Sequence, residues 1–269
     1  MPAREDVGAV TRACGHIPDR ACDVEEDLRT RHVGMLVGAS VGALPAAVDY
    51  SSLLDGVQDQ KSSSSCVGQA FATAIYLRAK IAGHPIARPS AKAIYDVARL
   101  SEQRDVLVDD GCRPRAAIDG MTEHGLVASE RWPLTDTNVN ELPPLDVFRA
   151  GVGATLSNHY RIASGSGCSL LMKSALAKGF PVPYSQPVDD GYLEYSGGIW
   201  RGMDGPTRGG HMQVALGYDV LYGTPYFLVA GSWGTSFGVD GFALIAESFF
   251  ESGLARDILV PTTIPTVIR

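Results

Sequence analysis

A cysteine that stands directly ahead of an apolar helical run constrains this chain more than any other feature. Cys66 follows a run of four serines, residues 62–65, and residues 70–82 carry apolar side chains at 70, 71, 74, 75, 77 and 81. This spacing favours a buried helix over an alternating strand. The first turn of a helix has unpaired N–H groups and the positive end of the helix dipole, so we expect the pKa of the Cys66 thiol to be lowered there. Cys66 is therefore the candidate nucleophile.

Gln60 lies six residues before Cys66, and its side-chain amide can donate hydrogen bonds. The pattern of Gln60, Cys66 and the pair Ala70 and Phe71 resembles the papain and cathepsin family of cysteine peptidases. The resemblance implies that the Gln60 side chain and the backbone N–H of Cys66 form an oxyanion hole. The chain also departs from the family, which usually has tryptophan or tyrosine where this chain has Val67.

His211 is the candidate base. A cysteine thiol is mostly protonated at neutral pH, so a nucleophilic cysteine needs a base nearby. His211 lies 145 residues after Cys66 (211 − 66), within the separation of about 130 to 150 residues that papain-like enzymes show. Gly210 before it and the apolar run after it resemble the histidine motif of the family. The resemblance implies that His211 takes the Cys66 proton and later delivers it to the leaving amine.

The segment Gly-Ser-Trp-Gly at residues 231–234 resembles the Asn-Ser-Trp-Gly block of the family, which implies that Trp233 covers one face of the His211 ring. Gly231 stands where the family has the asparagine that accepts the second N–H of the histidine. Losing an orienting acceptor costs at most about 10⁴ in rate. Three explanations stay open. A water or another side chain, such as the amide of Gln213, orients the ring; the protein binds peptides without cleaving them; or the residue at this position has been changed.

The segment after Gly111 and Cys112 differs from the glycine-rich turn with which the family holds the substrate backbone. This chain has the sequence Arg-Pro-Arg at residues 113–115. Because proline has no backbone N–H, we expect substrate anchoring by main-chain hydrogen bonds to be altered, and the two arginines suggest a preference for acidic or polar groups. The residues expected to contact substrate are Ser65, Arg113, Arg115, Gly210 and Trp233.

The resemblance begins at Leu44, so we expect an N-terminal extension over residues 1–43 and a peptidase domain over residues 44–269. The extension is expected either to occupy the cleft as a short pro-segment, which would make the protein a zymogen, or to lie on the surface without blocking the cleft. The apolar stretch at residues 33–48, which crosses from the extension into the domain, is too short and too interrupted by glycine and proline to span a membrane. We expect a buried strand or a segment that lies in a groove.

Helices and strands are expected in different halves of the domain. Ser90 is the expected N-cap of a helix over residues 90–100, and another helix over residues 115–124 ends at Gly125. Residues 134–168 are expected to form an irregular connection, apart from a short strand around a structural histidine, His159. Strands bounded by turn signals are expected at residues 181–185, 210–218, 225–231 and 241–246.

This order of elements, read with the resemblance, predicts an α+β fold of the papain-like type. We expect a helical lobe over about residues 50–135 and a sheet lobe over about residues 155–260. The sheet lobe would be an antiparallel sheet or partial barrel, with the active site in the cleft between the lobes.

The composition limits the partners and the redox chemistry. A net charge of −7 over 269 residues argues against nucleic acid or an anionic membrane as the main partner. The first 20 residues contain no apolar block of the secretory kind, so we expect a cytoplasmic protein or one exported by a signal-independent route. Five cysteines leave at least one free, and Ser63 stands where the family's commonest disulfide needs a cysteine, which favours a reducing compartment. Cys14, His16 and Cys22 lack the fourth ligand of a structural zinc site, and we expect neither a metal nor an organic cofactor.

The sequence therefore predicts a monomeric cysteine endopeptidase that hydrolyses peptide or protein substrates through a Cys66 and His211 acyl-enzyme mechanism, slowed by Gly231. The alternative is a catalytically impaired relative that acts as a peptide-binding module in the same cleft. A different acyl-transfer activity is disfavoured by Gln60 and by the spacing of the Ser-Trp-Gly block.

Overall fold

The helix α3 (Cys66–Ile81) forms the centre of a helical lobe. The computed structural model describes residues 12–38, 43–84, 86–263, 265 and 268. Every residue of α3 from Cys66 to Leu77 is buried. Gly68 is required in this helix, because a Cβ there would lie 2.3 Å from the carbonyl oxygen of Ala91 on the next helix. The helix predicted over residues 70–82 is confirmed, and it begins at Cys66 itself.

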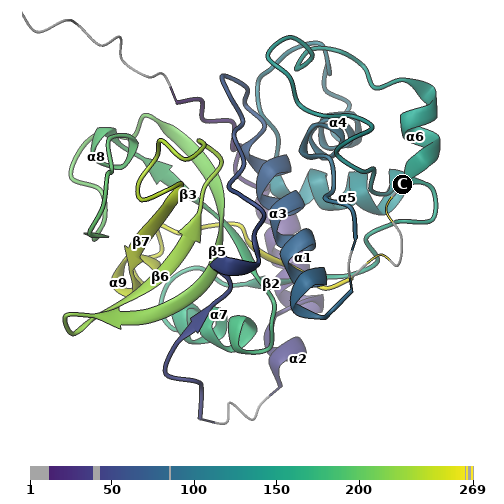
Figure 1. Cartoon of the computed structure of the whole chain (residues 1–269). Helices are drawn as coiled ribbons and strands as arrows, with labels where there is room; N and C mark the ends of the chain where they lie inside the picture. Colours follow the sequence, from purple (N-terminus) through teal and green to yellow (C-terminus); the bar gives the residue numbers. More distant parts are fainter. Residues whose placement is uncertain (1–11, 39–42, 85, 264, 266–267, 269) are drawn as a thin grey trace, which may run out of the picture.

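The next two helices of the lobe pack on α3 and on each other (Figure 1). Ser90 caps its second helix by accepting a hydrogen bond from the backbone N–H of Ala93, as the sequence predicts. Gly125 ends the next helix with φ of 81°, a left-handed conformation that favours glycine. The short strand expected around His159 is confirmed, but the rest of the region 134–168 is not irregular throughout, because it also contains a helix. The helices are α4 (Ala91–Ser101), α5 (Pro114–His124) and α6 (Leu145–Gly151).

The other lobe is a sheet built on the long strand β5 (Gly209–Leu221). All pairings in this sheet are antiparallel except the last, in which β4 lies parallel to β7. A separate antiparallel ladder joins β2 (His159–Ile162) to β8 (Ile258–Pro261). The four strands predicted from turn signals are confirmed. In spatial order the large sheet contains β1 (Val48–Asp49), β5, β6 (Thr224–Ala230), β7 (Phe242–Ala246) and β4 (Ile199–Trp200), with β3 (Val182–Val188) also paired to β5.

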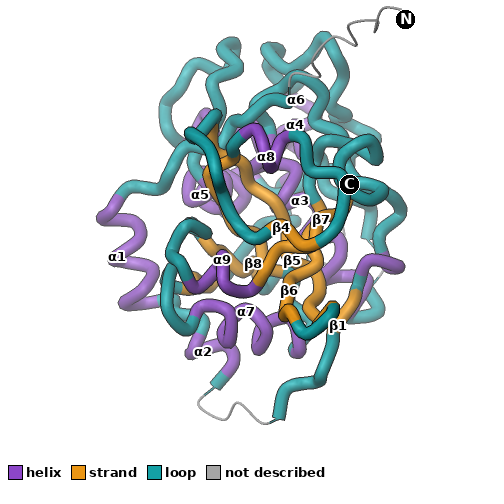
Figure 2. The backbone as a smooth tube through the Cα atoms, turned by 90° about the vertical axis from the view of Figure 1, so that its left-hand side faces the viewer, coloured by secondary structure: helices purple, strands orange, loops and turns teal. Residues whose placement is uncertain are grey.

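Short helices cover the sheet lobe. The helix α7 (Cys168–Ala177) packs on β3 and β5, and α9 (Glu247–Glu251) packs on α7, β6 and β7 (Figure 2). The turn α8 (Asp190–Leu193) follows β3, and the 3₁₀ turn η1 (Ser51–Leu53) contacts α3. The two lobes together form the α+β architecture that the sequence predicts (Figure 1).

The lobes meet where α3 packs against β5. One hydrophobic core cluster contains Cys66 and Phe71 from α3 together with Met212 and Val214 from β5. His211 is the residue next to Met212, so this packing brings the start of α3 and the start of β5 to the same place. The two candidate catalytic side chains therefore lie at the junction of the lobes.

The N-terminal part of the chain packs on both lobes. Residues 12–20 contain no helix, α1 (Ala21–Thr30) lies beside β2, and α2 (Gly34–Val37) packs on α7. Val33 and Val37 are buried in the core of the sheet lobe. The prediction of a strand or groove segment over residues 33–48 is wrong for residues 34–37, because a helical turn buries these valines against α7. Residues 39–42 lie outside the described part of the chain.

A buried ionic cluster ties the N-terminal residues to the body of the protein. Arg161 on β2 pairs with Asp19, Asp27 and Asp257, and its Nε lies 3.0 Å from Oδ2 of Asp27. None of these four side chains is more than 5% exposed. Buried charges are tolerated only when they are paired, so this cluster holds residue 19 and α1 against β2 and β8.

Asp27 is the carboxylate at the centre of this cluster. It also accepts hydrogen bonds from His159 (3.1 Å) and from Arg115 (2.8 Å). Burial opposes its ionisation, but the His159 hydrogen bond and the charges of His159, Arg161 and Arg115 outweigh burial and lower the pKa of Asp27 to about 2. Because this pKa is below the unfolded value of about 3.9, Asp27 contributes stability that is present above that value and is lost as the pH falls toward 2.

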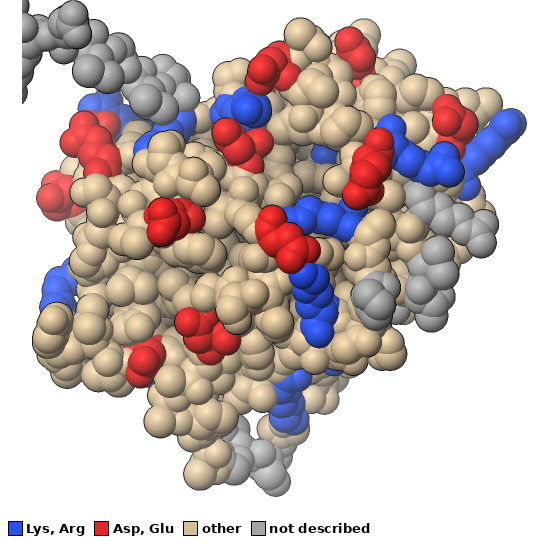
Figure 3. Space-filling model, viewed as in Figure 1, with Lys and Arg blue, Asp and Glu red and all other residues tan. Residues whose placement is uncertain are grey.

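Charges of both signs are interspersed on the face of the molecule shown in Figure 3. Among the helices of the described residues, none combines the length and the apolar character that crossing a bilayer requires.

Replacing Asp27 with asparagine is expected to lower the free energy of unfolding by about 3 kcal/mol at pH 7, because Arg161 would lose an ionised partner inside the protein. Urea denaturation measures the change. Asp119→Asn is the matched control, since Asp119 is 52% exposed in its pair with Arg115 and should contribute less than about 1 kcal/mol. The difference between Asp27→Asn and the parent should shrink as the pH falls from about 4 to 2. Equal stabilities at pH 7 would contradict the assigned role of Asp27.

Candidate active site

Gln60 is held rigidly beside the start of α3. Its Oε1 accepts a hydrogen bond from Oγ of Ser232 (2.6 Å), and its Nε2 donates to the carbonyl oxygen of Ser63 (2.7 Å). The backbone N–H of Gln60 also donates to the carbonyl oxygen of Ser232 (2.7 Å). The second N–H of the amide donates to the carbonyl oxygen of Ala13 (3.1 Å). The Nε2 group of Gln60 is thus held in a fixed position, with one of its N–H donors directed at the Ala13 carbonyl.

His211 lies on β5 and stacks on Trp233. The two ring centroids are 3.9 Å apart, and the rings are inclined by 17°. Both side chains are buried, and neither ring nitrogen of His211 has a hydrogen-bond partner among the described residues. Trp233 therefore covers one face of the imidazole, as the sequence resemblance implies. Stacking does not determine which ring nitrogen of His211 carries the proton.

Cys66 is fully buried, and burial is the main influence on its pKa. The backbone N–H groups of Met212, Gly15, Val67 and Cys66 itself favour the thiolate, but burial outweighs them and raises the pKa of Cys66 to about 11. The expectation that the helix N-terminus lowers this pKa is therefore wrong for the protein in this form. The N–H of Met212 reaches the sulfur from the residue after His211, which places the thiol beside the start of the histidine strand.

Burial also determines the charge of His211. Burial is the largest of the influences that together lower the pKa of His211 to about 3; the others are electrostatic repulsion from His16 and from Arg12. At neutral pH, this form of the protein therefore contains a neutral thiol and a neutral imidazole. A thiolate and imidazolium pair would require water or compensating charge at the site.

Residues 12–19, here called the resident segment, lie over these groups. The carbonyl oxygen of Ala13 accepts hydrogen bonds from Nε2 of Gln60 (3.1 Å) and from Nε1 of Trp233 (3.2 Å). Arg12 adds a cation over the Trp233 ring, 5.4 Å from its centroid. The Ala13 carbonyl thus occupies the side-chain N–H donors of Gln60 and Trp233 that face the reaction centre.

Main-chain hydrogen bonds hold the next part of the resident segment to both lobes. His16 pairs with Cys112 in a parallel bridge: the Cys112 N–H donates to Gly15 (3.1 Å), and the Ile17 N–H donates to Cys112 (3.1 Å). The His16 N–H donates to the carbonyl oxygen of Gly210 (3.1 Å). A Cβ on Gly15 would lie 1.8 Å from the carbonyl oxygen of Ser64, so only glycine permits this approach.

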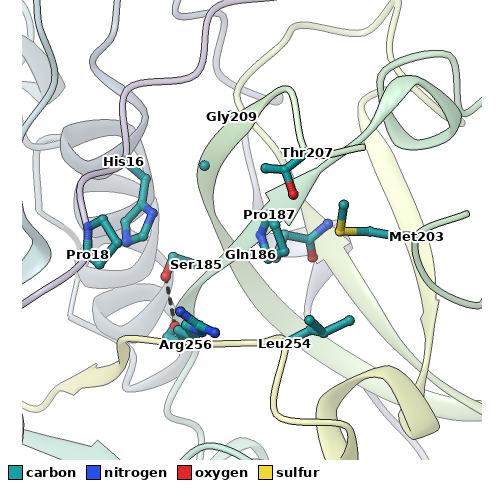
Figure 4. Close-up of a pocket in the computed structure, with 11 residues that line it drawn as sticks. His16, Pro18, Ser185, Gln186, Pro187, Met203, Thr207, Gly209, Leu254 and Arg256 are labelled. Carbon is teal, nitrogen blue, oxygen red and sulfur yellow. Dashed lines mark hydrogen bonds between the residues drawn. The ribbon is translucent and has the colours of Figure 1, made fainter. Parts of the chain in front are cut away.

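The side chain of His16 enters a cavity of about 520 Å³ beside β3 and β5. Its Nε2 lies 2.8 Å from Oδ2 of Asp257, and both side chains are almost fully buried. Figure 4 shows His16 and Pro18 on one side of this cavity, with Met203 and Leu254 on the other. The cavity thus has an apolar wall, and the Asp257 carboxylate is reached through His16 rather than being one of the lining residues, which include Arg256.

Gly231 leaves His211 without the acceptor that the family motif would supply. The amide of Gln213 does not replace it, because its Oε1 accepts from the Tyr192 hydroxyl (2.7 Å) and its Nε2 donates to the Tyr184 hydroxyl (3.2 Å). The explanation in which Gln213 orients the ring is therefore wrong. A Cβ at position 231 would have its nearest neighbour, Oε1 of Gln213, at 3.7 Å, so a side chain can begin there without a clash.

The two arginines after Cys112 are already paired. Arg113 forms an ion pair with Glu102 and donates to the carbonyl oxygen of Pro18 (3.1 Å). Arg115 pairs with Asp27 and Asp119. Their charges are thus neutralised within the chain, which weakens the expectation that they select acidic substrates.

The remaining expectations about this loop also change. Pro114 opens α5, where an N–H would have no helical partner, and the main chain of Cys112 hydrogen-bonds Gly15 and Ile17 of the resident segment. Ser65 is buried, and its hydroxyl bonds Ser63 Oγ (2.7 Å) rather than facing the cleft. The described residues contain no group of three or more histidine, cysteine or acidic side chains arranged to hold a metal ion.

Sequence reasoning missed Asp257 and its partners His16 and Arg161. Asp257 has φ of 43°, a left-handed conformation that is costly for a residue with a side chain. Its pairing with His16 spans 241 residues, and no local pattern marks either residue. Only the folded arrangement brings them together.

Comparisons with known proteins agree with this geometry. A family model described as papain family cysteine protease matches residues 44–262. Among curated relatives, cysteine proteinase 3 of Solanum lycopersicum is 31% identical over 121 residues, which are 44% of this chain and 32% of that protein. Cathepsin B-like cysteine proteinase 3 of Caenorhabditis elegans is 40% identical over 79 residues, which are 29% of this chain and 21% of that protein. The matches thus span less than half the length of these curated relatives.

Solved structures match over more of the chain. Xylellain, a cysteine protease from Xylella fastidiosa, superposes with a TM-score of 0.75 at 25% identity, covering 96% of this chain and 100% of that one. Digestive procathepsin L 3 of the Tenebrio molitor larval midgut superposes with a TM-score of 0.70 at 20% identity, covering 94% of this chain and 77% of that one.

Proposed function

The chain belongs to the papain family of cysteine proteases, and on that premise we propose that it hydrolyses peptide bonds with Cys66 as nucleophile and His211 as base. The observation that carries the proposal is the position of the Ala13 carbonyl, which accepts a hydrogen bond from Gln60 in a segment whose Gly15 packs against Ser64, two residues before Cys66. A substrate carbonyl in the same place would be polarised by the Gln60 donor beside the thiol.

The reaction then follows from the groups at the junction of the lobes. His211 takes the proton of Cys66, and the sulfur attacks the substrate carbonyl. Gln60 and the backbone N–H of Cys66 hold the oxyanion that forms. His211 delivers its proton to the leaving amine, and water attacks the acyl enzyme to release the product.

The resident segment is proposed to inhibit the enzyme as part of a short pro-segment within residues 1–43. Three features support this: it occupies the Gln60 donor, it pairs with Cys112 and Gly210, and it keeps Cys66 and His211 buried. Burial keeps both groups neutral, so the segment would suppress the ion pair as well as exclude substrate.

A peptide-binding module without catalysis is the second candidate. It is favoured by Gly231, because neither nitrogen of His211 has a partner among the described residues to orient the ring. The two candidates differ in the effect of Cys66→Ala, which abolishes a protease but leaves a binding module working.

Weakening the hold of the resident segment is expected to expose Cys66. In the full chain, the double variant His16→Ala with Asp19→Asn removes a bond to Asp257 and one to Arg161. An epoxide that alkylates papain-like cysteines should label this variant about tenfold faster or more than the parent, because each lost bond to a charged group contributes about 1.5–3 kcal/mol. Mass spectrometry of the tryptic peptide 62–78 measures labelling at Cys66.

The matched control is Glu25→Gln, an exposed position on α1, which should label at the parental rate. Equal labelling of the parent and the double variant would show that the segment is not the barrier. Labelling without cleavage of any peptide in a substrate library would favour the binding module.

The cavity around His16 is proposed to select a basic side chain of the substrate. Asp257 is a buried carboxylate that already pairs with the cationic or hydrogen-bonding ring of His16, and its pKa is lowered even though burial opposes its ionisation, because the His16 hydrogen bond and the charges of His16 and Arg161 outweigh burial. Met203 and Leu254 line the cavity that His16 enters, together with Arg256, and would pack against the apolar stem of arginine or lysine once Asp257 loses His16 as its partner.

In protein freed of the resident segment, Asp257→Asn is expected to lower kcat/KM for peptides with arginine at the selected position about tenfold relative to peptides with leucine there. A positional peptide library measures both substrates on the same preparation, so a general loss of folded protein cancels in the ratio. An unchanged ratio would mean that Asp257 does not contact the substrate.

Gly231→Asn is expected to raise kcat if the proposed reaction occurs, because the new amide can accept the second N–H of His211. The room for a Cβ at this position makes the change sterically feasible. Gly231→Ala is the matched control, because it adds a side chain without an acceptor. A rise in kcat for alanine as well, or for neither variant, would show that orientation of the ring does not limit the rate.

A further inference from the structure

The turn over residues 60–63 holds the proposed oxyanion donor. The carbonyl oxygen of Gln60 accepts hydrogen bonds from the backbone N–H of Ser63 (3.0 Å) and from the Ser63 hydroxyl (2.6 Å). In the opposite direction, Nε2 of Gln60 donates to the carbonyl oxygen of Ser63 (2.7 Å). Because a carbonyl oxygen only accepts, this last bond fixes which end of the Gln60 amide carries the N–H groups. Three bonds between residues 60 and 63 thus set both the position and the orientation of the amide.

Lys61, inside this turn, has a backbone conformation that needs support. Its φ is 57°, in the left-handed region that residues with a side chain rarely adopt. Such a conformation persists only where surrounding bonds hold it. The N–H of Lys61 donates to the Asp59 carboxylate (2.8 Å), but that side chain is 49% exposed and open to water. The buried bonds between Gln60 and Ser63 therefore provide the main support of the turn.

The Ser63 hydroxyl is the last member of a chain of hydrogen bonds that starts on α3. Ser63 and Ser65 are both buried, and their hydroxyl oxygens lie 2.7 Å apart. Each hydroxyl has one hydrogen, and Ser63 uses its own on the Gln60 carbonyl, so Ser65 must donate to Ser63. Nε2 of Gln69, on α3, donates in turn to the Ser65 oxygen (3.4 Å). The turn that carries Gln60 is thus fixed to the helix that carries Cys66.

The next residue, Ser64, is held separately by Asp109. Its N–H donates to both carboxylate oxygens of Asp109 (3.0 Å each), and the Tyr95 hydroxyl donates to the same carboxylate (2.8 Å). The Tyr95 hydroxyl also accepts from the N–H of Gly111 (3.0 Å). Cys112, which pairs with the resident segment, therefore stays tied to Ser64 even if the preceding turn opens.

We propose that Ser63 is a positioning residue for Gln60: its hydroxyl holds the turn that aims the Gln60 amide at the reacting carbonyl. The catalytic meaning rests on the proposed function, because an oxyanion forms only if Cys66 attacks a carbonyl. The holding of the amide does not depend on catalysis. Ser63 stands where the family's commonest disulfide needs a cysteine, so a buried hydroxyl here supports a loop that the family crosslinks covalently.

The side-chain amide of Gln60 reports directly on this turn. In the full chain, Nε2 of Gln60 donates to the carbonyl oxygens of both Ser63 and Ala13, so its protons should exchange slowly with solvent. Ser63→Ala is expected to speed their exchange about tenfold, because the lost buried hydrogen bond makes opening of the turn easier by about that factor. Two-dimensional ¹⁵N NMR measures the exchange, and the Gln60 signals are assigned by their absence in Gln60→Ala.

The matched control is Ser174→Ala on α7. Ser174 is also buried, and its hydroxyl donates to the carbonyl oxygen of Leu170 (2.7 Å), so this variant loses a comparable bond far along the chain from the turn. Exchange at Gln60 should stay at the parental rate. Two changes test rescue: Ser63→Thr keeps a hydroxyl, and Lys61→Gly added to Ser63→Ala relieves the left-handed strain. At least one of them should restore slow exchange.

The catalytic role is measured in the full-chain double variant His16→Ala with Asp19→Asn, which weakens the resident segment. Adding Ser63→Ala should lower kcat about tenfold, less than the cost of about 10²–10³ for removing an oxyanion donor outright. KM should change by less than about twofold, because the bonds of Asp109 are untouched. Alkylation of Cys66 by iodoacetamide should keep its rate, because this reaction displaces iodide and forms no oxyanion.

The outcomes separate the role of Ser63 from the proposed function. Unchanged Gln60 exchange in Ser63→Ala, equal acceleration in Ser174→Ala, or failure of both rescue changes would each overturn the proposal. A parallel loss of kcat and of iodoacetamide reactivity would show a general disturbance of the site and would also overturn it. The expected exchange in a protein that hydrolyses no peptide would refute the proposed function and still support the holding of Gln60 by Ser63.

Discussion

The packing of α3 against β5 is the contact on which the candidate site depends. It joins two segments that are far apart in sequence and places the Cys66 sulfur against the backbone N–H of Met212, the neighbour of His211. Because α3 is buried on nearly all sides and β5 is the centre of the sheet, neither element can shift without disturbing a whole lobe. The thiol and the imidazole are thus placed by the most rigid parts of the molecule.

Burial at the candidate site opposes the electrostatics that this placement would otherwise give. A helix N-terminus and several N–H groups favour a thiolate at Cys66, but burial outweighs them and the thiol stays protonated. The same burial, with Arg12 and His16 nearby, keeps His211 neutral. Solvent access to the cleft would therefore change the ionisation of Cys66 and His211. Burial of the site thus both excludes substrate and keeps the two groups neutral.

The sequence predicts the parts of this protein that depend on local patterns. The helix that begins at Cys66 and the strands around His211 follow from apolar spacing and turn residues, and the relation between the two residues follows from the family resemblance. The contact of Trp233 with the His211 ring also follows from the family resemblance. The pairing of His16 with Asp257 has no such signal, because a single salt bridge between distant residues leaves no periodicity. The rise in the Cys66 pKa could be predicted only from the folded structure, which shows that the thiol is buried.

Gly231 makes the orientation of His211 depend on stacking rather than on a hydrogen bond. Stacking on Trp233 fixes the plane of the ring, but it is nearly indifferent to which nitrogen carries the proton. Oε1 of Gln213 lies 3.7 Å from the position that a Cβ on residue 231 would take, but the hydroxyls of Tyr184 and Tyr192 already occupy the Gln213 amide. Breaking those two buried hydrogen bonds to free the amide would leave polar groups unsatisfied, which costs about 1–3 kcal/mol for each group. Among the described residues, the amide of Gln213 is therefore committed to the tyrosine hydroxyls, and neither ring nitrogen of His211 has an acceptor.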